Sequence, residues 1–140
     1  IKGKTTLFVD LDPQGNGTSG VGIRKNDIKS TSYDALLEAQ TIKSGIIETK
    51  YKNLSILPST LDLAAAEVEL ADLDDRESRL KKALEQIKDT YDVIVIDCPP
   101  SLGMLTINAL VAANGVIVPM QCEYFAMEGL NLLLKTVRRQ

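Results

Sequence analysis

The chain has 140 residues, enough for one domain or for part of one. Its hydrophobic content of 44% suffices for a core, which must be aliphatic because aromatic residues make up only 4%. The net charge of −3 gives no general signature of a nucleic-acid-binding protein, and the absence of histidine excludes histidine-based catalytic triads, metal sites and acid–base catalysis.

The strands and helices that the sequence predicts alternate along the chain. After a strand at residues 7–11 comes a polar loop at residues 12–32, whose Gly, Asn and Ser content is typical of a functional loop. The elements that follow are a short helix at 33–39 with Ser32 as a candidate cap, a helical turn at 42–48, a strand at 54–57, helices at 61–73 and 78–88, a strand at 92–97, a helix at 102–113, a strand at 115–119 and a helix at 125–139.

This alternation predicts an α/β fold with a mostly parallel sheet flanked by helices. No linker or internal repeat divides the chain, so residues 1–140 form one predicted domain. Because the chain begins with Ile1 and ends directly after a predicted helix, we expect this domain to be incomplete at both ends.

The two cysteines, Cys98 and Cys122, lie far apart and lack metal-binding spacing. Both adjoin apolar segments, so we expect buried, reduced thiols and a cytoplasmic protein. No apolar run approaches the roughly 20 residues that span a bilayer, and no membrane-spanning segment is therefore predicted.

Residues 93–96 form a β-branched apolar run that ends in Asp97 and then Cys98-Pro99-Pro100. Such a run is typical of a central strand that is covered on both faces. Asp97 then lies at the carboxyl edge of the sheet, where open α/β sheets bind ligands. The alternative is an aspartate that only caps a turn, but the preceding run favours a Mg²⁺ ligand.

Asp10 and Asp12 follow the first predicted strand and would point to the same face if the strand continued through them. Two neighbouring carboxylates repel each other unless a cation or a proton intervenes, which favours a metal or a catalytic role. The alternative is a solvated strand end before Pro13. The Gly- and Asn-rich loop that follows favours the functional interpretation.

Residues 3–6, Gly3-Lys4-Thr5-Thr6, match the end of a phosphate-binding loop, in which a lysine contacts the β- and γ-phosphates and a hydroxyl ligates Mg²⁺. Four residues are weak evidence alone, because a basic turn reads the same way. The context also differs, since a strand follows at once where a phosphate-binding loop has a helix. Two explanations stay open: residues are missing from the sequence, or this form does not hold nucleotide normally.

Taken together, these residues resemble the ParA/Soj/MinD group of P-loop ATPases with a deviant Walker A motif, and the ParA/Soj branch most closely. The resemblance covers nearly the whole chain from residue 7 onward, and the blocks around Asp12 and Asp97 are the most specific. The matching segments are residues 3–6, 9–16, 57–64, 96–103, 105–110 and 118–129.

This resemblance implies an ATP site with Mg²⁺. The nucleotide-binding residues that it implies are Gly3, Lys4, Thr5 and Thr6. Lys4 would contact the phosphates, and Lys2 would be the signature lysine that reaches the nucleotide of a partner subunit. The family loop reads KGGVGKTT and precedes a helix, whereas this chain has Ile-Lys-Gly-Lys-Thr-Thr and no helix there.

The resemblance also implies roles for the carboxylates. Asp12 would orient the attacking water, Asp97 would hold the magnesium shell, and Thr5 and Asp10 would complete the metal site. ATP would bridge two copies of the chain in a homodimer that binds DNA without sequence preference on the nucleoid. A ParB-like centromere-binding protein would stimulate slow hydrolysis and release the DNA.

Three alternatives stay open. The first is an interaction module of the same fold that has lost its nucleotide loop, as the sequence before residue 7 suggests. The second is a MinD-like regulator of cell division, which requires a C-terminal amphipathic helix rich in Lys and apolar residues; the chain does not reach far enough to test it. The third is a relative of the nitrogenase iron protein, for which two cysteines are too few.

Overall fold

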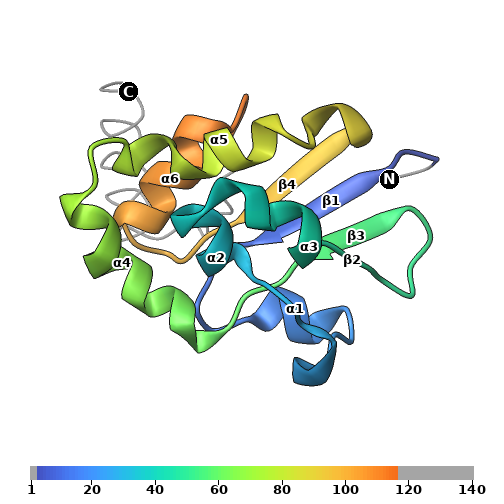
Figure 1. The fold of residues 1–140 in the computed structure, drawn as a ribbon. Helices are drawn as coiled ribbons and strands as arrows, with labels where there is room; N and C mark the ends of the chain where they lie inside the picture. The colour runs from blue at the N-terminus through green and yellow to red at the C-terminus, as the bar shows by residue number, and fades with distance from the viewer. Residues whose placement is uncertain (1–2, 117–140) are drawn as a thin grey trace, which may run out of the picture.

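The computed structural model describes residues 3–116, which form a four-stranded sheet with helices packed against it (Figure 1). The strands are β1 (Thr6–Asp10), β2 (Ile47–Glu48), β3 (Leu54–Leu57) and β4 (Val93–Asp97), in the order β2-β3-β1-β4. Strand β1 pairs in parallel with both β3 and β4, whereas β2 is antiparallel to β3. The predicted α/β fold with a mostly parallel sheet is confirmed.

Short helices connect the strands. The α-helices are α1 (Asn16–Gly20), α2 (Ser32–Leu37), α3 (Ile42–Gly45), α4 (Ala66–Glu69), α5 (Arg79–Glu85) and α6 (Met104–Ala112). The 3₁₀-helical turns are Lys25–Asp27, Ala39–Thr41, Leu61–Ala65, Leu70–Asp72, Arg76–Ser78 and Lys88–Thr90. Two of these turns flank α4 without a break, so residues 61–72 form one helical segment. No helix within residues 3–116 is long and apolar enough to cross a membrane.

Several predicted elements differ from those observed. The loop at residues 12–32 contains the short helix α1, and the turn predicted for 42–48 ends in strand β2, which forms because it pairs with β3. Helix α2 is capped by Thr31, whose N–H donates to the carboxylate of Asp34 (2.9 Å), so Ser32 is not the cap. Lys2, Cys122 and the helix predicted for 125–139 lie outside the described residues, as does most of the strand predicted for 115–119.

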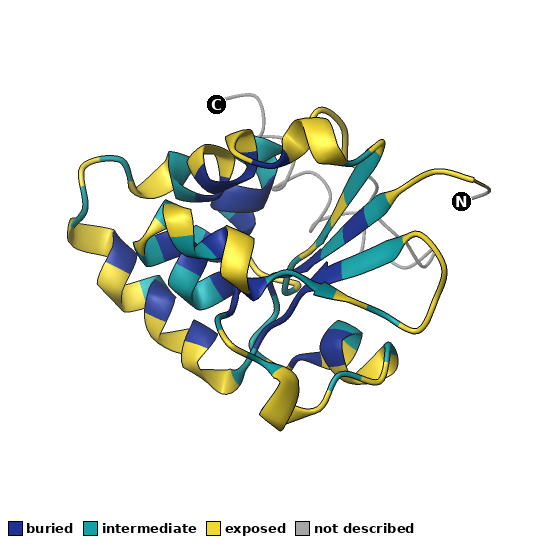
Figure 2. Cartoon of the chain, turned by 45° about the vertical axis from the view of Figure 1, so that its right-hand side comes forward, coloured by how far each residue is buried: buried dark blue, intermediate teal, exposed yellow. Residues whose placement is uncertain are grey.

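The core lies between one face of the sheet and the helices, and its fully buried hydrophobic side chains are Leu, Ile, Val and Ala, as predicted. Leu7 and Val9 of β1 are fully buried there beside Leu57, and helices α2, α5 and α6 cover them (Figure 2). Strand β4 differs from the prediction of a central strand covered on both faces. Among the described strands it lies at the edge of the sheet, and Val95 is 41% exposed.

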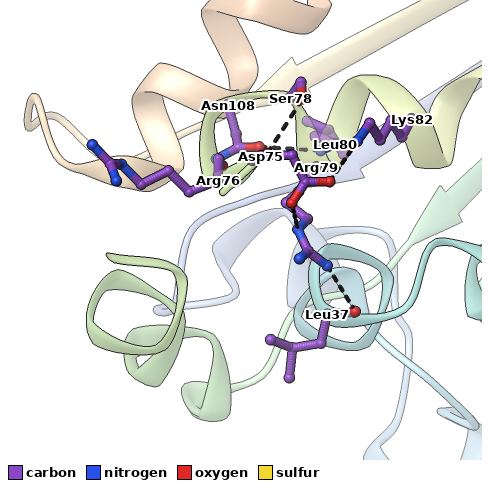
Figure 3. Close-up of polar contacts among 8 residues, drawn as sticks. All are labelled: Leu37, Asp75, Arg76, Ser78, Arg79, Leu80, Lys82 and Asn108. Carbon is purple, nitrogen blue, oxygen red and sulfur yellow. Dashed lines mark hydrogen bonds and ion pairs between the residues drawn. The ribbon is translucent and has the colours of Figure 1, made fainter. Parts of the chain in front are cut away.

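A buried amide joins the helices behind the sheet (Figure 3). Asn108 of α6 is fully buried, and its Oδ1 accepts the backbone N–H of Leu80 at the start of α5 (3.1 Å). Its Nδ2 donates to the carbonyl oxygens of Arg76 (2.8 Å) and Met104 (3.0 Å). The N–H groups of a first helical turn have no partner within the helix, so Asn108 satisfies one that would otherwise be buried without a bond.

We expect Asn108→Ala to lower the free energy of unfolding by about 3 kcal/mol, because it leaves buried backbone groups unpaired and opens a small cavity. Urea denaturation followed by circular dichroism measures this loss. The control is Asn26→Ala at an exposed position, which should change stability by less than about 0.5 kcal/mol. Equal losses in the two variants would contradict the structural role of Asn108.

Candidate functional site

The three predicted carboxylates gather at the carboxyl edge of the sheet. Asp10 and Asp97 end the parallel strands β1 and β4 and are partners in their register. The backbone N–H of Leu11 donates to the carbonyl oxygen of Asp97 (2.7 Å), so the two strand ends stay joined just beyond these residues. Asp12 follows in the loop after β1. The structure therefore brings together all three residues at the edge where open α/β sheets bind ligands.

Asp10 is fully buried and is held by donors from its own chain. Its Oδ2 accepts the backbone N–H of Thr18 (2.8 Å) and the Thr18 hydroxyl (2.6 Å), and its Oδ1 accepts the N–H of Asp12 (3.3 Å). Helix α1 comes this close because residue 17 is glycine: a Cβ there would lie 2.5 Å from the Phe8 ring and 3.3 Å from Oδ2 of Asp10. Asp10 thus organises the loop, and its oxygens are already occupied by hydrogen bonds.

A second set of bonds fixes the loop around Asp12. The Thr18 hydroxyl accepts the N–H of Ser59 (3.0 Å), and the Ser59 hydroxyl donates to the carbonyl oxygen of Asp12. The Asp12 side chain accepts the N–H of Gln14 (3.0 Å), and the N–H of Gly15 donates to the Asp12 carbonyl (2.9 Å). Gly15 has a φ of +66°, a conformation that favours glycine. The loop is therefore rigid around Asp12.

Sequence reasoning missed Thr18 and Ser59. Ser59 follows β3 after Pro58, so its place just beyond a strand end was a usable signal. Thr18 carries no such signal, because its role depends on α1 folding back onto β1.

Asp97 differs sharply from its register partner Asp10. Its side chain is exposed and has no hydrogen-bond donor among the described residues. Partial burial raises the pKa of Asp97 above its ordinary value of 3.8, and the negative charges of Asp10 and Asp12 raise it further. A carboxylate that is repelled by its neighbours and lacks donors is suited to accept a cation.

The loop after Asp97 is anchored at its far end by Glu67 of α4. The Glu67 carboxylate accepts the backbone N–H groups of Met104 and Leu105, the latter at 3.3 Å, and so caps α6 from outside that helix. A Cβ at residue 103 would lie 2.5 Å from Oε1 of Glu67, so a larger residue there would require the Glu67 carboxylate to shift. Glu67 was not predicted as a site residue, because its role depends on the packing of α4 against α6.

The thiol of Cys98 begins this loop and is half-buried, less than the burial predicted for it. Burial raises the pKa of the Cys98 thiol above its ordinary value of 9.0. The thiol is therefore protonated at neutral pH, and Cys98 is a poor nucleophile.

Residues 3–6 lie at the opposite edge of the sheet. The N–H of Thr5 donates to Oδ2 of Asp92 (2.9 Å), and the Thr5 carbonyl accepts the N–H groups of Asp92 and Val93. Lys4 is exposed, and β1 begins at Thr6 with no helix between. In Figure 1 the start of β1 and the turn between β2 and β3 share this right-hand edge.

This placement corrects the predicted metal and phosphate site. Strand β1 has five residues, so Thr5 lies about 17 Å from Asp10 at roughly 3.3 Å per residue. Magnesium binds its ligands at about 2.1 Å, so Thr5 and Asp97 of one chain cannot hold the same ion. Gly3, Lys4, Thr5 and Thr6 are consequently not brought together with the three carboxylates. Lys2 lies outside the described residues.

The carboxyl edge fits part of a magnesium–nucleotide site. Within residues 3–116, no group of three or more acidic, cysteine or histidine side chains could hold a metal ion by itself. Magnesium usually takes one or two protein carboxylates, and phosphates and waters complete its shell. The free carboxylate of Asp97 matches that requirement, whereas Asp10 is already bound by Thr18.

Comparison with known proteins places this fold among nucleotide-binding proteins. A sequence model of the AAA domain family matches residues 1–140. The chain is 54% identical over 136 residues to the sporulation initiation inhibitor protein Soj of Bacillus subtilis, covering 97% of the chain and 54% of that protein. It is 55% identical over 139 residues to the chromosome-partitioning ATPase Soj of Treponema pallidum, covering 99% of the chain and 54% of that protein.

The fold also superposes on solved structures of related proteins. Cobyrinic acid a,c-diamide synthase from Mycobacterium smegmatis, with bound ADP and magnesium, superposes with a TM-score of 0.90 at 40% identity, covering 99% of this chain and 56% of that one. A plasmid partition protein from Borrelia burgdorferi superposes with a TM-score of 0.86 at 33% identity, covering 99% and 62%. The chain spans about half the length of the curated relatives it matches.

We expect Thr18→Val to lower the free energy of unfolding by about 2 kcal/mol, because the buried Asp10 carboxylate loses a donor and the Ser59 N–H loses its acceptor. Thermal or urea denaturation measures the change. Thr18→Ser keeps the hydroxyl and removes only a methyl group, so it should cost about 0.8 kcal/mol or less. If serine were as damaging as valine, the methyl group would matter as much as the hydroxyl, and the hydrogen bonds of Thr18 would not be its dominant contribution.

We expect Asp97→Asn to stabilise the nucleotide-free protein at pH 7, by less than about 1 kcal/mol because the side chain is exposed. A raised pKa in the folded state means that the ionised carboxylate disfavours folding. The gain should therefore be full at neutral pH and shrink as the pH falls toward 3.8, where the native carboxyl is protonated. Melting temperatures from pH 4 to pH 8 measure it, with the exposed Asp74→Asn as control. A gain independent of pH would contradict this origin.

Proposed function

This chain belongs to the AAA domain family, and from that membership and its carboxylate cluster we propose that it is part of an ATP-dependent switch in DNA segregation. The resemblance to the ParA/Soj group predicted from the sequence is confirmed by its Soj and ParA relatives. The observation that supports this function best is the convergence of Asp10, Asp12 and Asp97 at the carboxyl edge, where no residue within 3–116 donates a hydrogen bond to the Asp97 side chain.

The three carboxylates have separate roles in this proposal. Asp97 contributes an oxygen, directly or through water, to the shell of a Mg²⁺ ion that accompanies ATP. Magnesium neutralises the charge of the phosphates during hydrolysis. Asp12 orients the attacking water, since its loop is rigid while one of its carboxylate oxygens accepts no bond from a described residue. Asp10 is a positioning residue that acts through Thr18.

The phosphate-binding loop is formed in this proposal by residues other than 3–6. Those residues lie at the amino edge of the sheet, where Thr5 is bonded to Asp92. Lys4 lies at the amino edge, where it does not reach a nucleotide bound at the carboxyl edge. The role of Lys2 as the signature lysine stays a prediction, because Lys2 lies outside the described residues.

The assembly follows the family resemblance. ATP bridges two copies in a homodimer, the dimer binds DNA through phosphate contacts without sequence preference, and a ParB-like partner stimulates hydrolysis and releases the DNA. The switch operates in the cytoplasm on the nucleoid, and residues 1–140 are part of one ATPase domain. Slow intrinsic hydrolysis agrees with a chain that has no histidine and no strong base at the carboxyl edge.

One observation favours a second candidate, an interaction module of the same fold that does not hold nucleotide. Residues 3–6 are held as an ordinary turn at the amino edge and do not form a phosphate cradle. The two candidates differ in one measurable property, which is Mg²⁺-dependent binding of ATP.

In the intact protein, we expect Asp12→Asn to lower the rate of ATP hydrolysis by about 100-fold while ATP binding persists, because the variant cannot orient the water but keeps the fold. Phosphate release measures the rate, and a fluorescent ATP analogue measures binding. The matched control is Lys4→Ala, which should change neither quantity because Lys4 lies at the opposite edge.

Two results would contradict this assignment. If the unaltered intact protein bound no ATP in the presence of Mg²⁺, the interaction module would be the correct function. If Lys4→Ala abolished ATP binding, the phosphate site would lie at residues 3–6, and the carboxyl edge would not be the nucleotide site.

A further inference from the structure

The helical segment of residues 61–72 is apolar on two opposite sides. Its inner side carries Leu63, Ala66 and Leu70, which are fully buried against the core. Its outer side carries Leu61 and Val68, which are 71% and 75% exposed. Leu61 belongs to the 3₁₀ turn and Val68 to α4, and both side chains are exposed while Leu63, Ala66 and Leu70 are buried. An amphipathic helix that only covers a core has a polar outer face, so a second apolar side needs another explanation.

The exposed residues between and beside this pair complete the outer face. Ala64, Ala65 and Ala71 are exposed and have small side chains, which leaves Leu61 and Val68 as its only large apolar groups among the described residues. In Figure 1 the segment lies at the left-hand margin of the molecule, and in Figure 2 its outer side is exposed along its length. Within residues 3–116, this face is therefore exposed.

Acidic side chains border this apolar face. The exposed ones are Asp62, Glu69, Asp72 and Asp74. None of them belongs to an ion pair with another described residue, since the pairs in this region join Asp75 to Arg79 and to Lys82. Residues 61–75 contain no lysine or arginine. The surface thus combines two exposed apolar side chains with an acidic rim. Arg76 lies beside it, donating to the carbonyl oxygen of Ala71 (3.2 Å), and Glu69 accepts the hydroxyl of Tyr33 (2.6 Å).

We propose that this outer face of residues 61–72 is a docking surface for a positively charged amphipathic helix of a partner protein. Leucine-sized side chains of such a helix, three, four and seven positions apart, would cover Leu61 and Val68. Its lysine or arginine residues would meet the acidic rim, which favours both encounter and register. A second copy of this segment is a poorer occupant, because its own acidic residues would oppose the rim.

The segment also touches both loops of the carboxyl edge. Ser59, just before it, bonds to Asp12 and Thr18, and Glu67 within it caps α6 behind the loop that follows Asp97. A helix docked on the outer face would contact the element that positions both loops. Docking itself does not depend on ATP hydrolysis, so it can be tested apart from the proposed function.

The test uses a synthetic helical peptide of leucine and lysine, with leucines at positions 1, 4 and 5 of each seven-residue repeat, labelled with a fluorophore. Its affinity for the intact protein is measured by fluorescence anisotropy without nucleotide. We expect Leu61→Ser with Val68→Ser to weaken binding by about tenfold or more. Asp62→Asn with Asp72→Asn should weaken it similarly and reduce its dependence on salt.

Matched controls change the same kinds of residue elsewhere. Tyr51→Ser alters an exposed apolar residue outside the segment, and Asp27→Asn alters an exposed carboxylate, so both should bind the peptide normally. Circular dichroism and melting temperature establish that every variant is folded, and the altered side chains are all exposed. Unchanged affinity in the segment variants would overturn the docking surface.

Two further outcomes would also overturn it. Equal binding of a scrambled peptide with the same composition would show charge adsorption without a helical site. A loss of self-association in Leu61→Ser with Val68→Ser, measured by analytical ultracentrifugation, would show that a second copy occupies this face.

Discussion

The carboxyl edge depends on one buried carboxylate. Asp10 is fully buried at the end of β1, and its charge is compensated by the N–H and hydroxyl of Thr18. Burying an unpaired carboxylate costs several kcal/mol, so α1 must stay where Thr18 can donate. The same residue also fixes α2, because the hydroxyl of Ser32 donates to the Asp10 carbonyl (2.8 Å). Loop, helix and strand ends are thus held around a single charge.

Two identical side chains in register serve different purposes because their surroundings differ. Asp10 has three donors and no exposure, whereas Asp97 is exposed and is repelled by its neighbours. Repulsion from the Asp10 carboxylate raises the energy of an ionised Asp97 and so increases the gain when a cation binds there. The buried carboxylate therefore supplies both the rigidity of the edge and part of its preference for cations.

The sequence predicted the strands well where local residues determine them. The β-branched run at residues 93–96 and the proline after residue 57 set the ends of β4 and β3. The sequence-based prediction was wrong where contacts between distant parts of the chain determine the structure. Strand β2 exists because β3 lies beside it. Thr31 caps α2 through its bond with Asp34, while the Ser32 hydroxyl bonds to the Asp10 carbonyl. Likewise, the exposure of Val95 depends on the position of β4 in the sheet, which strand composition does not specify.

The direction of the parallel strands explains why the carboxylate site was predicted correctly and the phosphate loop was not. A carboxylate at the end of an apolar run reaches the carboxyl edge wherever parallel strands run side by side, so Asp10 and Asp97 had to meet. Residues 3–6 precede their strand and therefore enter the sheet at the other edge, although their letters match a phosphate-binding loop. A short motif indicates which chemistry its residues could perform, but the direction of the adjacent strand determines at which edge of the sheet they lie. The segment of residues 61–72 is linked to both loops, because Ser59 just before it bonds to Asp12 and Glu67 within it caps α6. Since protein cores are close-packed, a contact on this segment can shift the loops at the carboxyl edge.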